Sequence, residues 1–79
     1  MNNQEKLKQI LASVFNLGID QITEDASPDS IENWDSLNHL NLVLALEEGF
    51  GVSFSEEQTV EILNYELIVI TLKELGVDI

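Results

Sequence analysis

Apolar residues recur at helical spacing in the first part of the chain. Between Asn3 and Asn16 they follow the i, i+3, i+4, i+7, i+8 pattern that places them on one face of a helix. The residues are Leu7, Ile10, Leu11, Val14 and Phe15. The pattern predicts an amphipathic helix with one face on a core, and Gly18 predicts its end.

Turn-forming residues dominate the next segment, from Ile19 to Trp34. Their side chains compete with a helical backbone for hydrogen bonds, which predicts a long loop. The residues are Asp20, Asp25, Ser27, Pro28, Asp29 and Ser30. A loop of this length in a compact domain is often functional, and this one leads directly to Ser36.

A second helical pattern extends from Ser36 to Phe50. Asp35 precedes it as a good N-cap, because a carboxylate accepts the free amide hydrogens of the first turn and favours the positive end of the helix dipole. At about 100° per residue, the apolar positions form two arcs. The first arc is predicted to face the core and comprises Leu42, Val43, Leu46 and Phe50.

The second arc contains Leu37, Leu40 and Leu44 and lies beside Ser36. Burying both arcs is difficult in a small domain, so we expect Leu37 and Leu44 to be partly exposed. Ordinary core packing of these leucines is the open alternative.

Two shorter helices are predicted after Gly51. Ser55 and Gln58 match a capping box, which indicates a short helix over Glu56–Ile62. Asn64 is positioned to cap a last helix that ends at Gly76. Its segment 68–71 is β-branched and also suits a strand, but a single strand has no partner, which favours helix.

The predicted fold is therefore all-α, a small four-helix bundle with a short third helix and a long loop between helices 1 and 2. Residues 1–79 contain no repeat and no linker, which predicts a single domain. A chain of this length buries only about 60% of its unfolded surface, too little to enclose a cleft shielded from water.

Acidic residues dominate the charge of the chain. Fifteen acidic residues against three basic ones give a net charge of −12. Between Asp20 and Glu66 all twelve charged residues are acids. This charge repels nucleic acid and anionic lipid, which predicts basic protein partners, no nucleic acid and no membrane insertion. Strong like charge also favours a monomer.

The residue types present exclude several kinds of site. Without cysteine the chain has no disulfide and no thiolate nucleophile, and one histidine does not make a zinc site, so no dedicated metal site is expected. Loose binding of divalent cations to Glu56, Glu57 and Glu61 is expected at most. The amino-terminal residues lack the apolar core of a secretory signal, and the apolar run 67–70 is too short for a bilayer. These features predict a cytoplasmic or organelle-matrix protein.

Ser36 is the candidate functional residue, although many Asp-Ser pairs only start a helix. Nucleophilic catalysis with His39, one turn away, is disfavoured because nothing visible orients the imidazole, supplies an oxyanion hole or excludes water. We therefore predict no catalytic residue and no enzyme. His39 is expected to be a packed or half-exposed polar residue. Trp34 is expected to pack the long loop onto the bundle, with a partner contact as the alternative.

The run Asp35-Ser36-Leu37, together with the helix that follows, resembles the modification site and second helix of the acyl carrier proteins. The matching residues of the helix are Leu40, Leu42, Val43, Ala45, Leu46, Glu47, Glu48 and Phe50. The resemblance extends over nearly the whole chain. It implies that the Ser36 hydroxyl receives 4′-phosphopantetheine from coenzyme A, transferred by a separate phosphopantetheinyl transferase, and that cargo is carried as a thioester. It also implies that Asp35 assists the transferase, through a basic side chain or its magnesium ion.

The resemblance further implies a docking surface for acyl-transfer and biosynthetic enzymes with basic patches. Its residues on the second helix are Leu37, Leu44, Glu47 and Glu48. A groove between the last three helices would shelter an acyl chain, unless the same side chains simply fill the core. Its lining would be Leu42, Leu46, Val60, Ile62 and Ile68.

The chain departs from the family pattern next to the serine. Asn33 and Trp34 stand where a glycine often precedes Asp-Ser-Leu, and Asn38 and Asn41 stand where an acid often follows. Fewer charges here favour partners from a specialised lipid, polysaccharide or natural-product pathway over the standard fatty acid elongation enzymes. Fatty acyl, hydroxyacyl, aminoacyl and polyketide cargoes remain open. The alternative function is an unmodified acidic adaptor that binds a basic protein.

Overall fold

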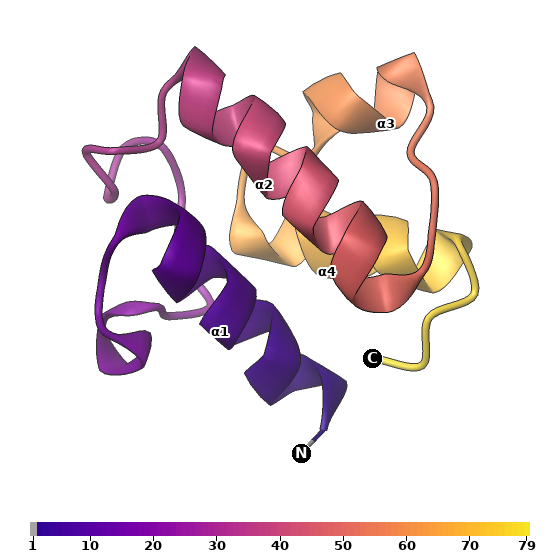
Figure 1. Ribbon diagram of the computed structural model, residues 1–79, viewed down its shortest axis with the longest axis horizontal. Coiled ribbons are helices and arrows are strands. Elements are labelled where there is room, and N and C mark those ends of the chain that lie inside the picture. Colours follow the sequence, from indigo (N-terminus) through magenta and orange to yellow (C-terminus); the bar gives the residue numbers. More distant parts are fainter. Residues whose placement is uncertain (1) are drawn as a thin grey trace.

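The computed structural model describes residues 2–79, which fold into helices joined by loops (Figure 1). The helices are α1 (Asn3–Phe15), α2 (Ser36–Phe50), α3 (Glu56–Glu61) and α4 (Tyr65–Glu74), with a 3₁₀ turn η1 (Ile19–Gln21). No strand occurs within the described range. The all-α fold with a short third helix and a long first connection is confirmed, and the β-branched segment 68–71 is helical.

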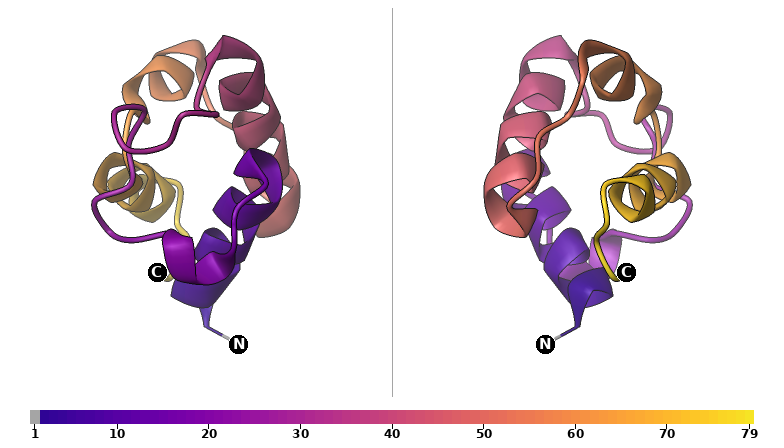
Figure 2. Two further views of the ribbon diagram at one scale, coloured as in Figure 1. Left: turned by 90° about the vertical axis from the view of Figure 1, so that its left-hand side faces the viewer. Right: turned by 90° about the vertical axis from the view of Figure 1, so that its right-hand side faces the viewer.

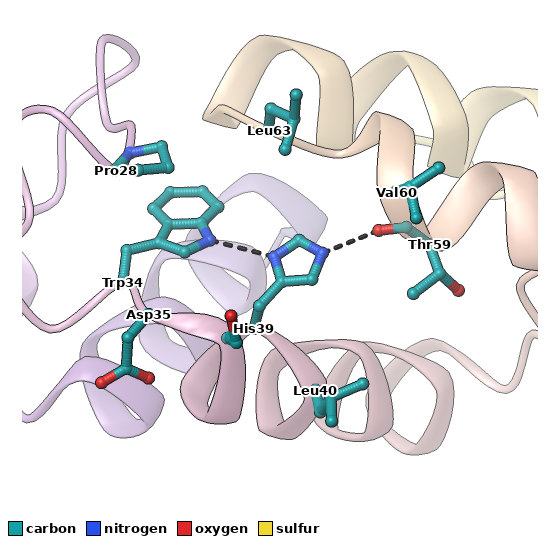
Figure 3. A pocket seen from close by; sticks show the side chains of 9 residues that line it. Pro28, Trp34, Asp35, His39, Leu40, Thr59, Val60 and Leu63 are labelled. Atoms are coloured by element: carbon teal, nitrogen blue, oxygen red, sulfur yellow. Dashed lines mark hydrogen bonds between the residues drawn. The ribbon is translucent and has the colours of Figure 1, made fainter.

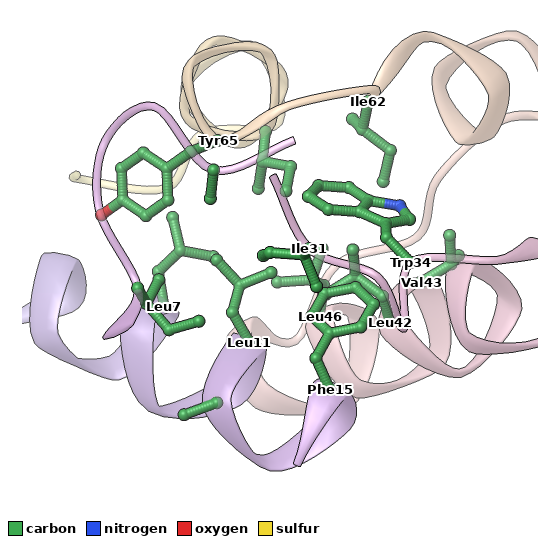
Figure 4. Packing of buried hydrophobic residues seen from close by; sticks show 14 of the residues in the cluster. Leu7, Leu11, Phe15, Ile31, Trp34, Leu42, Val43, Leu46, Ile62 and Tyr65 are labelled. Carbon is green, nitrogen blue, oxygen red and sulfur yellow. The ribbon is translucent and has the colours of Figure 1, made fainter. Parts of the chain in front are cut away.

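Helices α1 and α2 lie side by side in opposite directions, and α4 lies on the other side of the core (Figures 1 and 2). Helix α3 stands at the end of the bundle where α2 begins. Side chains from α1, α2, α4 and the long loop meet between these layers (Figure 4). The arrangement leaves the start of α2 between the loop and α3.

Helix α1 ends at Phe15, within one residue of the predicted limit at Asn16, but a different residue from the predicted one ends it. Asn16 adopts the left-handed conformation with φ 57°, so the helix stops at Phe15 before the chain reaches Gly18. Asparagine is one of the few residues other than glycine that enter this region readily. Gly18 instead begins η1, where its amide donates to Gln21 Oε1 at 2.8 Å. The prediction of Gly18 as the end signal is therefore wrong.

The long connection between α1 and α2 is ordered by buried apolar side chains. The turn η1 interrupts the predicted loop at its start. Ile22, Ala26, Ile31 and Trp34 are buried in the common core. The amide of Tyr65 donates to the Ala26 carbonyl at 2.9 Å, which ties the loop to the first residue of α4. The loop is thus a structural layer of the domain.

The core contains the predicted inner arc of α2. Leu42, Val43 and Leu46 are buried, whereas Phe50 is only partly buried, with the Lys6 ammonium 5.2 Å from its ring centroid. Gly49 lies where α1 approaches closely, because a Cβ atom there would be 2.7 Å from Ile10 Cδ1. A glycine lowers helix propensity by about 1 kcal/mol relative to alanine, and here it permits close helix packing.

Helix α3 is attached to the bundle mainly at its two ends. The predicted capping box is present, with Ser55 Oγ accepting from the Gln58 amide and Gln58 Oε1 accepting from the Ser55 amide. None of its six residues is buried. The flanking residues reach the core instead, with Phe54 partly buried and Ile62 fully buried.

Candidate functional site

Ser36 is the first residue of α2, and its side chain is exposed. Asp35 caps the helix, its Oδ1 accepting from the Asn38 amide at 2.8 Å. Amides at the first positions of a helix have no carbonyl within the helix to bind. The Ser36 hydroxyl is therefore exposed to solvent at the positive end of the α2 dipole.

Trp34 packs the end of the long loop, just before Ser36, against α1. Its side chain is buried, and its ring centroid lies 5.0 Å from that of Phe15 at the end of α1. Asn33 Nδ2 donates to the Phe15 carbonyl at 2.9 Å. The predicted role of Trp34 in packing the loop onto the bundle is confirmed.

An open, mostly apolar hollow of about 610 Å³ adjoins Ser36 (Figure 3). Ser36 and Asp35 lie on its border, at the start of α2. The other lining residues come from the long loop, α2, α3 and the segment after α3. They are Pro28, Trp34, His39, Leu40, Thr59, Val60 and Leu63.

His39 spans this hollow with both ring nitrogens bonded. Trp34 Nε1 donates to His39 Nδ1 at 3.0 Å, and His39 Nε2 lies 2.7 Å from the Thr59 carbonyl oxygen (Figure 3). His39 is half-buried, as predicted for a packed polar residue. The imidazole has no nitrogen free to take a proton from Ser36, so the geometry agrees with the expectation that this pair is not a catalytic one.

Three leucines of α2 project from the surface beside the site. The exposed fractions are 69% for Leu37, 56% for Leu40 and 63% for Leu44. The partial exposure predicted for Leu37 and Leu44 is confirmed, and Leu40 is exposed as well. Val60 and Leu63 are also exposed, at 66% and 54%, on the opposite side of the hollow. Exposed apolar residues grouped in this way are typical of interaction surfaces.

The two predicted docking carboxylates of α2 have different surroundings. Glu48 is exposed, whereas Glu47 is half-buried and its Oε2 accepts from the Phe54 amide at 2.8 Å. Glu47 therefore holds the segment between α2 and α3. Sequence reasoning missed this role, because the two residues lie seven positions apart in no recognised capping motif.

Four of the five residues predicted to line an interior groove are instead packed in the core. Leu42, Leu46, Ile62 and Ile68 are fully buried in the core, and Val60 instead faces the external hollow. Of the two alternatives left open by the sequence, core filling describes these four residues.

In residues 2–79, no group of three or more histidine, cysteine or acidic side chains is arranged to hold a metal ion. No helix within that range has the length and apolar character needed to cross a membrane. Tyr65 lies on a face formed by α1, the loop and α4, where its hydroxyl donates to Gln4 Oε1 at 2.6 Å. Burial raises the pKa of Tyr65, and the negative charge of Glu24 raises it further.

Comparisons with known proteins identify the family. No protein-family model matches the chain. An acyl carrier protein of Petrotoga mobilis is 35% identical over 75 residues, which cover 94% of this chain and 88% of that protein. An acyl carrier protein of Buchnera aphidicola is 36% identical over 58 residues, covering 72% and 73% of the two chains. The chain belongs to the acyl carrier protein family, whose members are non-catalytic carriers.

Proposed function

We propose that this protein carries acyl intermediates on a 4′-phosphopantetheine group attached to Ser36. The observation that supports this most strongly is the exposed hydroxyl at the start of α2, bordering an open hollow, in a chain of this family. A 4′-phosphopantetheine group supplies the thiol on which cargo is held as a thioester. The chain has no cysteine, so such chemistry requires a thiol from outside.

The residues around Ser36 fit such a group. The free amides of the first turn of α2 and the helix dipole suit the phosphate. The hollow offers an apolar surface beside the attachment point, at Leu40 and Val60. Asp35 holds the first turn through the Asn38 amide, and its exposed carboxylate is available to a basic side chain or a magnesium ion of the transferase.

The pathway is proposed from the residues beside the site. Partners are enzymes of fatty acid, lipid or specialised biosynthesis that have basic docking patches, and the protein acts in the cytoplasm. Trp34 and Asn38 replace residue types frequent in the family, which favours a specialised set of partners. Acyl cargo is preferred over aminoacyl or polyketide cargo because both relatives are acyl carrier proteins.

The absence of cysteine makes the modification directly measurable. We expect the purified chain to show no reactive thiol, and to gain one thiol per chain after incubation with coenzyme A, magnesium and a broad-specificity phosphopantetheinyl transferase. Thiol titration and intact mass on the same sample provide the measurement. An unmodified acidic adaptor would gain neither, under conditions in which a known carrier protein reacts.

Docking on partner enzymes is expected to depend on salt and on Glu48. Attraction between the acidic chain and a basic patch is screened as ionic strength rises, so the dissociation constant for the transferase should increase by about tenfold or more between low and high salt. Glu48→Gln should weaken binding at low salt. Leu37→Ala and Leu44→Ala should weaken it at both salt concentrations, because apolar contacts are not screened.

Glu47→Ala tests the structural role of Glu47, with urea unfolding as the measurement. Glutamine would keep an oxygen that accepts from the Phe54 amide, whereas alanine removes the bond and should lower the free energy of unfolding by about 1 kcal/mol. Equal binding at low and high salt, measured by titration calorimetry with folded protein, would contradict the electrostatic part of the proposal.

A further inference from the structure

Two hydrogen bonds connect three segments of the chain around Ser36. Trp34 Nε1 and the Thr59 carbonyl oxygen bind opposite sides of the His39 ring, at 3.0 Å and 2.7 Å (Figure 3). An indole N–H can only donate, so His39 Nδ1 must accept and is unprotonated. The proton of the neutral ring is then on Nε2 and is donated to Thr59. The hydrogen-bond pattern therefore assigns one tautomer.

The Thr59 bond is important because α3 has few other attachments. The helix has six residues, none of them buried. Carbonyls in the last turn of a helix have no amide donor within the helix, and Thr59 lies in that turn. The imidazole N–H of α2 supplies a donor there. Besides this bond, the flanking residues Phe54 and Ile62 connect α3 to the core.

The residues that make these bonds, and their neighbours, line the hollow beside Ser36. His39 and Leu40 line the hollow from α2, while Thr59 and Val60 line it from α3. Leu40 and Val60 are both more than half exposed. The distance between these two exposed side chains, and the width of the hollow, therefore depend on where α3 is held.

We propose that His39 is a positioning residue for the reactions of Ser36. By bonding Trp34 and Thr59 it holds α3 and the long loop against α2, in the arrangement that partner enzymes bind. This inference rests on the proposed carrier function. A partner that binds a mobile α3 must order it, which weakens binding and leaves the chemical step unchanged, so the loss appears in KM more than in kcat.

Two substitutions of His39 test the proposal. His39→Phe keeps a planar ring but has no N–H, whereas His39→Gln keeps an amide N–H that can reach the Thr59 carbonyl. His39→Phe loses both bonds, but only the Thr59 bond attaches α3. With phosphopantetheinyl transferase and coenzyme A, we expect it to raise KM for the carrier about three- to tenfold, the worth of the Thr59 bond, with kcat nearly unchanged. His39→Gln should restore most of the loss.

Hydrogen exchange provides a readout that does not depend on modification. Amides of residues 56–62 should exchange faster in His39→Phe than in the unchanged chain, while those of α1 should not. The ¹⁵N spectrum of the unchanged chain should show the neutral ring protonated at Nε2.

Unchanged KM, or unchanged exchange of residues 56–62, would overturn the proposal, as would faster exchange throughout α1. If the unchanged chain is not modified at all, the proposed carrier function fails. The exchange of residues 56–62 in His39→Phe would still show whether His39 holds α3, so this failure is distinct from that of the positioning role.

Discussion

Ser36→Ala is expected to abolish modification completely. The substitution removes the only atom to which the proposed phosphate ester would be attached, so neither mass nor thiol content should increase with coenzyme A and the transferase. Because Ser36 is exposed at the first position of α2 and Asp35 provides the cap, the fold should be little affected. Intact mass spectrometry with circular dichroism measures both properties.

Ser53→Ala is the matched control, since Ser53 is also exposed but lies after α2. This variant should be modified as fully as the unchanged chain. A mass increase in Ser36→Ala equal to that of the control would show that another residue accepts the group, and the assignment of Ser36 would be wrong.

Phe15→Ala is expected to lower the free energy of unfolding more than any of the other proposed substitutions. Phe15 is fully buried, contacts Trp34 through their rings and lies where α1, the loop and α2 meet. Truncation of a buried phenylalanine costs about 3–5 kcal/mol. A domain of this size has a total stability of about 4–12 kcal/mol, so a large fraction of it would be lost. Urea unfolding followed by circular dichroism measures the change.

The fluorescence of the single tryptophan measures the loss of packing around Phe15 directly. Trp34 is buried against Phe15, so its fluorescence should shift towards that of a solvent-exposed indole in Phe15→Ala. Ile19→Ala, at a side chain already 44% exposed, is the control and should cost much less. A loss below about 1 kcal/mol in Phe15→Ala would contradict the described packing.

Local patterns predicted the helices well, because each pattern lies within one element. The inner arc of α2, the caps Asp35, Ser55 and Asn64, and the exposure of Leu37 all follow from spacing within about one or two turns. The residue that ends α1 was misassigned because both asparagine and glycine adopt the left-handed conformation readily, and here Asn16 adopts it before the chain reaches Gly18.

Of the candidate site, the sequence predicted Ser36 and the exposed leucines Leu37 and Leu44, but not the hydrogen bonds around them. Ser36 stands out by its position after a cap and before an apolar helix. The bond from His39 to Thr59 joins residues twenty positions apart, and that from Glu47 to Phe54 spans the turn after α2. Such contacts depend on how the helices pack together, for which the local sequence carries no periodic signal.

The central claim is that Ser36 accepts the 4′-phosphopantetheine group. Fragmentation mass spectrometry of the chain after reaction with coenzyme A and the transferase tests it most directly. We expect one added group per chain, located on Ser36 and bearing the chain's only thiol. An added group on any other residue, or no addition where a known acyl carrier protein is fully modified, would contradict it.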